Sequence, residues 1–174
     1  MLMPFNLQKW IDENRDILKP PINNKNLYKE AGDFIVMVVG GPNARKDYHY
    51  NESEELFYQL EGEMTVFAQI DGKKQEITIK EGEMFLLPSN TPHNPVRPAN
   101  TIGLVIERVR KGTKMSDGLF WFCDECNHPL HHYRFPLENI ESDFQIRFKE
   151  FYNSEELRTC KQCGHVMEAD ERFL

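Results

Sequence analysis

The amino-acid sequence predicts a mainly β protein, a β-sandwich or jelly roll, with one helix before it and a metal-bound segment after it. Short apolar runs separated by turn residues recur about every ten residues between positions 34 and 108, as in antiparallel all-β folds. A run with helical periodicity precedes them. All four cysteines follow them, in two CxxC pairs.

The N-terminal helix is expected after Asn6, whose side chain can cap a first helical turn. From Leu7 to Leu18, apolar residues recur at spacings of three and four, which indicates one apolar helical face. Pro20 and Pro21 should end this helix, because proline lacks the amide hydrogen that a helix interior requires.

Six strands are then expected. Residues 34–39 form a β-branched run that is too short for a core helix, and Gly40, Gly41 and Pro42 end it. The other five predicted strands are residues 56–60, 64–70, 75–80, 84–87 and 102–108. Asp71 and Gly72 indicate a hairpin, because both central residues of a type I′ turn need a positive φ.

The character of the sequence changes at Asp117. We therefore expect residues 1–116 to form the β domain with its helix, and residues 117–174 to form a small C-terminal annex packed against it. A helix should follow Pro136, a residue that suits the first turn. Its apolar face would carry Leu137, Ile140, Phe144, Phe148 and Phe151.

The four cysteines predict a second metal site. Each CxxC pair can form a knuckle whose two thiolates face one ion, and two knuckles complete a tetrahedral site: Cys123, Cys126, Cys160 and Cys163. Iron and zinc both suit four thiolates. A closed ligand shell has no position for a substrate, so we expect it to hold the annex together. Electron transfer or iron storage is the alternative role.

Composition argues against several classes of function. The chain of 174 residues has a formal charge of −7, so it lacks the basic surface that nucleic acids or anionic membranes attract. No apolar run approaches the roughly 18 residues of a membrane span, and the N-terminus lacks a signal-peptide core. We therefore expect a cytoplasmic protein, and in a reducing compartment the paired CxxC cysteines indicate metal ligands rather than disulfides.

His49, Glu55 and His93 are the candidate ligands of a catalytic metal. Two imidazoles and one carboxylate form a facial triad that leaves open positions on a non-haem ferrous ion, an arrangement typical of oxygen activation. Zinc also fits the ligand chemistry. Alternation favours Glu55 over Glu54, because Glu55 shares a strand face with Phe57.

The spacing of these residues resembles the two motifs of the cupin superfamily. The first motif is matched by His49, Asn51, Glu55 and Gly62, with asparagine in place of the usual second histidine. The second is matched by Gly82, Pro88, Asn90, His93 and Arg97, with Asn90 for glycine and Arg97 for asparagine. The resemblance implies a jelly-roll barrel. Its departures imply a three-ligand site with room for a chelating substrate and a cation beside it.

Charged residues surround the predicted ligands. Arg45 and Arg97 each lie four positions from a histidine of the triad. Alternation along residues 102–108 puts Gly103 and Glu107 on one face, and the pattern leaves open which face is the inner one. A guanidinium binds a planar carboxylate through two hydrogen bonds. The pocket therefore suits a small, anionic, aromatic molecule that chelates iron.

Longer stretches resemble the 3-hydroxyanthranilate 3,4-dioxygenase family over nearly the whole chain: GGPNARKDYHYNESEELFYQLEG, FLLPSNTPHNPVRPAN and TIGLVIERVR, with KPPINN before them and the CxxC pairs after them. The resemblance implies Fe(II) at His49, Glu55 and His93. It implies substrate contacts from Arg45, Glu55, Arg97, Glu107 and Asn24, with Asn24 on a mobile loop and Arg45, Arg97 and Glu107 as catalytic residues. It also implies a second metal, Fe or Zn, at the four cysteines.

The activity implied by this resemblance is ring opening of 3-hydroxyanthranilate with O₂ to 2-amino-3-carboxymuconate semialdehyde, the precursor of quinolinate in the kynurenine pathway. Whether this serves NAD biosynthesis or degradation stays open. A homodimer is expected by analogy, because cupins commonly bury strand edges in a dimer.

Two other functions fit parts of the sequence. One is a different cupin oxygenase that acts on another small anion, which oxygen uptake with several aminophenols would distinguish. The other is a metal-binding sensor whose annex contacts nucleic acid or a partner. The basic residues of the annex form no concentrated stripe, which argues against a sensor that binds nucleic acid: Arg134, Arg147, Lys149, Arg158 and Lys161.

Overall fold

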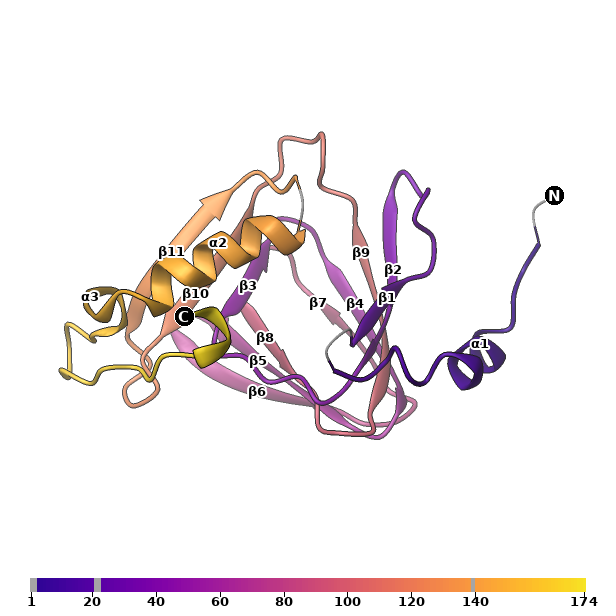
Figure 1. Ribbon diagram of the computed structural model, residues 1–174, viewed down its shortest axis with the longest axis horizontal. Coiled ribbons are helices and arrows are strands. Elements are labelled where there is room, and N and C mark those ends of the chain that lie inside the picture. Colours follow the sequence, from indigo (N-terminus) through magenta and orange to yellow (C-terminus); the bar gives the residue numbers. More distant parts are fainter. Residues whose placement is uncertain (1–2, 21–22, 139) are drawn as a thin grey trace.

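Two antiparallel β-sheets packed face to face form the body of the protein (Figure 1). The computed structural model describes residues 3–20, 23–138 and 140–174, without the side chains of residues 140 and 141. Pro21, one of the two prolines predicted to end the first helix, lies outside these residues. The mainly β jelly roll with an N-terminal helix and C-terminal helices agrees with the predicted fold class.

Each sheet has a simple spatial order. The five-stranded sheet consists of β1 (Asn24–Asn26), β2 (Phe34–Gly40), β9 (Ile102–Arg108), β4 (Glu55–Glu61) and β7 (Met84–Leu87). The six-stranded sheet consists of β11 (Pro129–Phe135), β10 (Asp117–Phe122), β3 (Tyr48–Asn51), β8 (His93–Val96), β5 (Met64–Ile70) and β6 (Lys73–Ile79). The antiparallel pairing of β3 with β8, and of β4 with β9, brings distant parts of the chain together.

The apolar core lies between the two sheets. Phe57 and Val105 enter it from the five-stranded sheet, and Val66 and Ala68 enter it from the six-stranded sheet. Because Val105 points into this core, the face of β9 that also carries Glu107 is the inner one. The structure thus decides a choice that the sequence pattern left open.

The predicted strands are present, with differences at some of their ends. Strands β5, β7 and β9 have the predicted bounds, while β2 and β4 are slightly longer than predicted. Strand β6 starts two residues early, at Lys73, and ends one residue early, at Ile79. Asp71 and Gly72 between β5 and β6 have φ values of 51° and 71°, as a type I′ turn requires.

The sequence pattern misses five strands, β1, β3, β8, β10 and β11. All four residues of β3 are buried, on both faces of the sheet, so apolar and polar residues do not alternate there. Strand β8 is equally short and contains Pro95. These two strands carry the two candidate histidine ligands, so the period-two signal is weakest where the site lies.

Helix α1 (Leu7–Glu13) is shorter than predicted. Asn6 caps it as expected, accepting a hydrogen bond from the backbone amide of Lys9 at 2.9 Å. Asn14 ends it with non-helical dihedral angles, so the predicted continuation to Leu18 is wrong. Leu18 still packs with Ile11 in the cluster on the outer side of the five-stranded sheet, but from a turn. The apolar spacing therefore predicted the packing rather than the helix length.

The C-terminal helices pack against β10 and β11 (Figure 1). They are α2 (Ile140–Tyr152), α3 (Glu155–Arg158) and the 3₁₀ helix η1 (Glu171–Phe173). The predicted helix after Pro136 begins only at Ile140, whose side chain lies outside the described part. Leu137 precedes the helix and is nevertheless buried with Phe144, Phe148 and Phe151.

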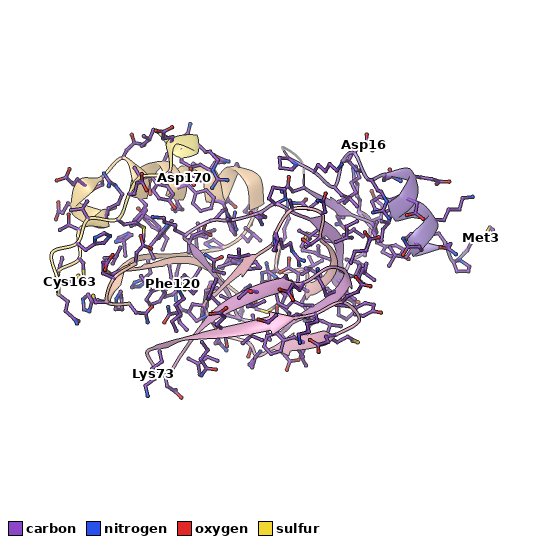
Figure 2. The ribbon with its side chains drawn as sticks, turned by 90° about the horizontal axis from the view of Figure 1, so that it is seen from below. Met3, Asp16, Lys73, Phe120, Cys163 and Asp170 are labelled. Carbon is purple, nitrogen blue, oxygen red and sulfur yellow. The ribbon has the colours of Figure 1, made fainter. Side chains whose placement is uncertain are left out.

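The six-stranded sheet continues into the C-terminal part of the chain. Strand β10 pairs with β3 from Asp117 opposite Asn51 to Phe120 opposite Tyr48, directly after the predicted division at residue 116. Met3 and Cys163 lie at opposite ends of the molecule, so the N-terminal helix and the cysteine cluster are far apart (Figure 2). Over the described residues, no helix combines the length and the apolar character that a membrane crossing needs.

Candidate metal centre and active site

His49, Glu55 and His93 meet between the two sheets. His49 on β3 and His93 on β8 are directly opposite in the register, and Glu55 comes from β4 in the other sheet. Glu55 and His93 are buried, His49 is 9% exposed, and one potential ligand atom from each lies within 4.8 Å of the others. The structure therefore brings together the three residues that the motifs indicate.

The hydrogen bonds of His93 prepare it to bind a cation. Its Nδ1 lies 3.0 Å from the carbonyl oxygen of Thr91, which can only accept, so Nδ1 carries the proton of the neutral ring. Its Nε2 faces Glu55 Oε2 at 3.1 Å. A backbone carbonyl on the far nitrogen is the usual outer partner of a metal-binding histidine.

His49 is held by a carboxylate from the C-terminal part of the chain. Its Nε2 lies 2.7 Å from Oδ1 of Asp117, the first residue of β10. Burial raises the pKa of Asp117, but its hydrogen bonds with His49 and Arg110 outweigh this effect and lower it. With Nε2 bonded to Asp117, Nδ1 is the nitrogen that a cation can use. The ring of Phe144 from α2 lies 5.3 Å from the His49 ring.

Glu55 is an anion in this environment. Burial raises its pKa, but His93, His49 and Arg110 together lower the pKa of Glu55 to about 2. Asn51, which replaces the second histidine of the usual cupin motif, donates from Nδ2 to Glu55 Oε2 at 3.2 Å. Asn51 therefore orients the carboxylate from the position where the motif has a further ligand.

Arg97 is a buried cation beside this site. Its side chain is held by Gln59, whose Oε1 accepts from Nη1 at 3.1 Å. Burial lowers the pKa of Arg97 to about 10, so the guanidinium is charged at neutral pH. A Cβ on Gly103 would lie 2.6 Å from Arg97 Nη1, so only glycine leaves room for the guanidinium here. Across the described residues, no carboxylate lies within ion-pair distance of Arg97.

Glu107 lies opposite Glu55 in the register of β9 and β4 and is buried. Burial and the negative charge of Glu55 raise the pKa of Glu107, and Arg110 opposes this shift without cancelling it. Its Oε2 accepts from Arg110 Nη1 at 2.7 Å. The structure thus places this predicted residue on the inner face, next to the triad.

Sequence reasoning missed Arg110 and Asp117. Both are buried and charged, and Arg110 Nε donates to Asp117 Oδ2 at 2.8 Å. Arg110 follows the end of β9, where alternation no longer assigns a residue to a face, and Asp117 was taken only as a boundary. Two signals were available in the sequence. Arg110 is the last residue of the stretch TIGLVIERVR, and Asp117 stands where the character of the sequence changes.

The side chain of Arg45 contacts Asp47 and Phe148. Its Nε is 3.3 Å from Asp47 Oδ1, and its guanidinium carbon lies over the ring of Phe148 at 5.3 Å from the ring centre. Among the described side chains, no hydrogen bond or ion pair joins Arg45 to Arg97 or to the three candidate ligands. Arg45 is therefore fixed by α2 and by Asp47.

The expectation that Asn24 lies on a loop is wrong. Asn24 begins strand β1 and pairs with Val39 of β2, because backbone hydrogen bonds extend the five-stranded sheet by one short edge strand. Directly opposite residues share a face, so Asn24 lies on the inner face with Val39. It is exposed at the sheet edge.

The four cysteines converge as a second candidate metal site. Cys123 and Cys163, and likewise Cys126 and Cys160, have sulfur atoms 3.6 Å apart. Four sulfurs about 2.3 Å from one ion in a tetrahedron would be separated by roughly 3.8 Å, so the spacing fits such an ion.

The two knuckles have matching backbone geometry. The amide of Cys123 donates to the carbonyl of His128, and the amide of Cys160 donates to that of His165, both at 2.8 Å. Asn127 and Gly164 take equivalent positions with φ values of 59° and 76°. All four cysteines are free thiols. The arrangement fits a closed tetrahedral site in the annex.

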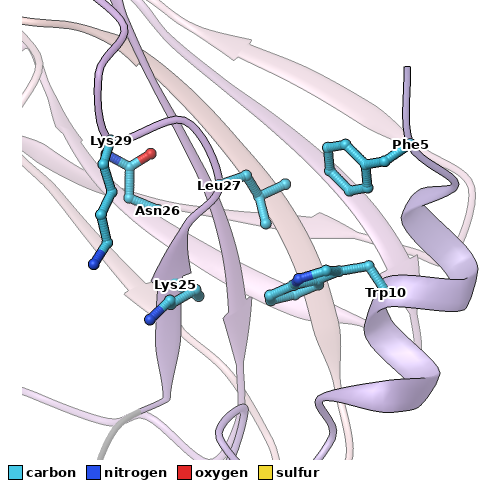
Figure 3. Close-up of a pocket in the computed structure, with 6 residues that line it drawn as sticks. All are labelled: Phe5, Trp10, Lys25, Asn26, Leu27 and Lys29. Atoms are coloured by element: carbon cyan, nitrogen blue, oxygen red, sulfur yellow. The ribbon is translucent and has the colours of Figure 1, made fainter. Parts of the chain in front are cut away.

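A surface cavity of about 420 Å³ lies between α1 and β1, away from both candidate metal sites (Figure 3). Phe5 and Trp10 line it on the helix side, and Lys25, Asn26, Leu27 and Lys29 line it on the other. It contains none of the residues that the motifs indicate.

Comparisons with known proteins agree with this geometry. A family model described as 3-hydroxyanthranilic acid dioxygenase matches residues 1–152. A 3-hydroxyanthranilate 3,4-dioxygenase of Xanthomonas oryzae pv. oryzae (strain MAFF 311018) is 53% identical over 173 residues, which cover 99% of this chain and 97% of the relative. One from Bacillus thuringiensis (strain Al Hakam) is 48% identical over 167 residues, covering 95% and 92%.

Among solved structures, a cupin-2 domain containing protein from Shewanella frigidimarina is 19% identical, with a TM-score of 0.46 over 60% of this chain and 100% of that one. The sequence matches are far closer. Because the family model covers most of the chain and the relatives match nearly its full length, the chain belongs to the 3-hydroxyanthranilic acid dioxygenase family.

Proposed function

We propose that this chain is a non-haem iron dioxygenase that opens the ring of 3-hydroxyanthranilate with O₂ to give 2-amino-3-carboxymuconate semialdehyde. The observation that carries the proposal is the position of Arg97, a buried guanidinium bonded to neutral Gln59, in the same interior as the His49, Glu55 and His93 cluster. A buried cation next to a metal-binding cluster suits a substrate that has both a carboxylate and chelating groups. Membership of the family supports the same substrate.

Fe(II) fits the donor set at the first site. Two imidazole nitrogens and one carboxylate oxygen within 4.8 Å of one another provide three ligands, and three ligands leave adjacent positions free. Bound there, Fe(II) would supply a Lewis acid that holds the hydroxyl and amine of the substrate and O₂ side by side. His49, Glu55 and His93 are the residues that would hold it.

Arg97 binds the substrate carboxylate. Gln59 engages only Nη1, so the other guanidinium nitrogens can donate to an anion. In a site shielded from water, a charged hydrogen bond contributes more than it does at the surface. Fixing the carboxylate also fixes the angle of the ring relative to the triad.

Glu107 takes the proton of the substrate hydroxyl. Its raised pKa makes it a better base than an ordinary carboxylate. Arg110 bonds only Oε2, which leaves Oε1 for the substrate. Loss of that proton increases the electron density of the ring, which favours attack by O₂ next to the hydroxyl carbon.

Arg45 and Asn24 complete the substrate contacts in this proposal. Arg45 is ordered by Asp47 and Phe148, and Asn24 lies on the inner face at the edge of the five-stranded sheet. Glu55 also contacts the substrate, because a molecule that chelates the ion lies against the ion's ligands.

The four cysteines hold a second ion, iron or zinc, that has a structural role in the annex of residues 117–174. The matched knuckle geometry and the 3.6 Å sulfur separations support this assignment. A tetrahedral shell of four thiolates has no open position for a substrate. The chemistry therefore belongs to the first site alone.

The protein acts as a homodimer in the cytoplasm, without nucleic acid or membrane partners. The outer face of the five-stranded sheet supports a dimer, because Phe34, Met84 and Leu86 are each more than half exposed there, at 53%, 63% and 53%. Two CxxC pairs that bind an ion rather than form disulfides fit a reducing compartment, and a formal charge of −7 disfavours nucleic acids and anionic lipids.

Anaerobic reconstitution with Fe(II) tests the proposal. When air is admitted, the absorption of 3-hydroxyanthranilate should fall as the ring opens, and an H93A variant should show no change. In R97A, the lost charged hydrogen bond should weaken substrate binding by about 1.5–3 kcal/mol. Unchanged absorption with the iron-loaded protein would refute the function. Equal turnover of 2-aminophenol, which lacks the carboxylate, would refute the role of Arg97.

A further inference from the structure

We propose that Arg110 and Asp117 are positioning residues: Asp117 holds the imidazole of His49, and Arg110 holds both Asp117 and Glu107, in one fixed arrangement. This inference rests on the proposed function, because His49 is there a metal ligand and Glu107 a substrate-binding base. It concerns two residues that touch neither the substrate nor the metal in that function.

A continuous run of three hydrogen bonds carries the inference. His49 Nε2 lies 2.7 Å from Asp117 Oδ1, Arg110 Nε lies 2.8 Å from Asp117 Oδ2, and Arg110 Nη1 lies 2.7 Å from Glu107 Oε2. Glu107, Arg110 and Asp117 are 4%, 2% and 0% exposed, and His49 is 9% exposed. Bonds between charged groups shielded from water are strong and orient their partners.

The guanidinium is the side chain that can connect two carboxylates in this way. It has donors on separate edges of one rigid plane, so Nε and Nη1 can engage Asp117 and Glu107 at fixed relative positions. Nη1 also donates to the carbonyl of Arg108 at 2.9 Å, which ties the plane to the end of β9. A lysine ammonium has no such plane.

Within the described residues, Arg110 Nη2 is buried and has no hydrogen-bond partner. An unpaired buried donor is unfavourable. The hydrogen bonds of Nε and Nη1 therefore set the position of the guanidinium.

The same contacts join the two sheets at the site. Glu107 lies on β9 of the five-stranded sheet, while His49 and Asp117 lie on β3 and β10 of the six-stranded sheet. Arg110 belongs to the connection between β9 and β10, where its carbonyl accepts from the side chain of Thr113 at 2.6 Å. Arg110 thus sets the position of Glu107 relative to His49 across the interior.

Arg110 also balances the charge of the site. It attracts Glu55, Glu107 and Asp117, three buried carboxylates that would otherwise repel one another. Replacing Arg110 with an uncharged residue would change the charge of the site as well as the positions of its side chains. The tests therefore replace Arg110 with lysine, which keeps the positive charge, and change only one oxygen of Asp117 to an NH₂ group.

The first test is D117N, with Fe(II) and Co(II) affinity measured by equilibrium dialysis. Asparagine keeps one acceptor oxygen and presents an NH₂ group on its other side. If the NH₂ group faces Arg110, that bond is lost, and if it faces His49, it donates to Nε2 and leaves the ring proton on Nδ1, the nitrogen that a cation would use. We expect metal affinity to fall about 10–100-fold, the usual effect of removing an outer partner of a metal-binding histidine. The d–d absorption of the Co(II) form should shift as the His49 ring reorients.

The second test is R110K, with anaerobic affinity for 3-hydroxyanthranilate and the EPR spectrum of the nitric oxide adduct as readouts. Lysine keeps the charge but cannot hold both carboxylates in one plane. We expect about tenfold weaker substrate binding, and heterogeneous EPR signals in place of one species. R15K is the matched control, because Arg15 also bridges two carboxylates, Asp12 and Glu61, at the exposed surface.

Wild-type metal affinity in a folded D117N, or an R110K variant that behaves like R15K, would overturn the inference. If neither variant folded, Arg110 and Asp117 would be structural rather than positioning residues, which also contradicts it. If the wild type bound metal but not 3-hydroxyanthranilate, the proposed function would fail, while the dialysis of D117N would still decide the His49 half of the inference.

Discussion

At the scale of single residues, the site depends on side chains whose surroundings leave them one conformation. Arg97 is the example. Gln59 accepts a hydrogen bond from Nη1 of Arg97. Gly103 lies next to the same nitrogen, and the guanidinium occupies the space that a side chain at position 103 would fill. The direction of the guanidinium is thereby set before any substrate binds, which reduces the entropy lost on binding.

We expect G103A to damage substrate recognition specifically. The new Cβ would lie 2.6 Å from Arg97 Nη1 and 2.8 Å from Gln59 Oε1, so the guanidinium must move. Steady-state kinetics should show KM raised about tenfold or more, in line with a lost charged hydrogen bond, and a smaller change in kcat.

G32A is the control for this substitution, because nothing lies within 4 Å of a Cβ at Gly32. Equal kinetic constants for G103A and the wild type would show that Arg97 does not anchor the substrate.

At the scale of elements, α2 links the annex to the site. Its Phe144 lies against His49, and its Phe148 lies under Arg45. The helix is itself held by aromatic packing, since Phe151 stacks on Trp121 at 4.1 Å between ring centres and both are fully buried. The stability of α2 and the geometry of the site should therefore change together.

Phe151→Ala should destabilise the protein by about 3–5 kcal/mol, because it opens a cavity in the aromatic cluster of the annex. Urea unfolding followed by tryptophan fluorescence would measure this, with Trp121 as a local reporter. Ile146→Ala on the same helix is the matched control and should cost much less, because Ile146 is half exposed. Similar losses in the two variants would contradict the packing described here.

At the scale of the whole molecule, one end of the sandwich carries α1 and the other carries the cysteine cluster, with the triad between the sheets (Figures 1 and 2). The six-stranded sheet extends through β10 and β11 into the annex, so the annex shares hydrogen bonds with the strand that carries His49. Loss of the ion at the four cysteines should therefore also disturb the geometry of the site at His49, Glu55 and His93.

We expect C160S to lose the second ion and to loosen the C-terminal segment, because a structural metal contributes directly to folding. Elemental analysis should show one ion fewer per chain, and limited proteolysis should cut within residues 123–174. Turnover should fall as α2 loses its support. A variant with full activity and wild-type resistance to protease would show that the cysteines have no structural role.

The apolar outer face of the five-stranded sheet predicts a dimer that charge can disrupt. Leu86→Lys places a charge beside Met84 on this face and should shift the sedimentation coefficient from dimer to monomer. Gln75→Lys, on exposed β6 of the other sheet, is the control and should leave the dimer intact. A wild-type monomer at micromolar concentration would contradict the prediction.

The sequence by itself determined the class of fold and the residues of both candidate metal sites. Strands β5, β7 and β9, the turn at Asp71 and Gly72 and the cap at Asn6 follow from local preferences, which act over a few residues. The cysteine pairs and the His49, Glu55 and His93 spacing could be recognised because metal chemistry restricts the types of ligand residue.

Only the tertiary structure decided which face of β9 is the inner one, where α1 ends, and that Asn24 lies in a strand. It also showed Arg110 and Asp117, the buried pair that connects His49 to Glu107. These features depend on contacts between residues that are distant in sequence, such as His49 and Asp117, or on residues that follow the end of a strand, such as Arg110. Periodicity along the chain carries no information about such contacts, because it reports only which residues share a face of one element.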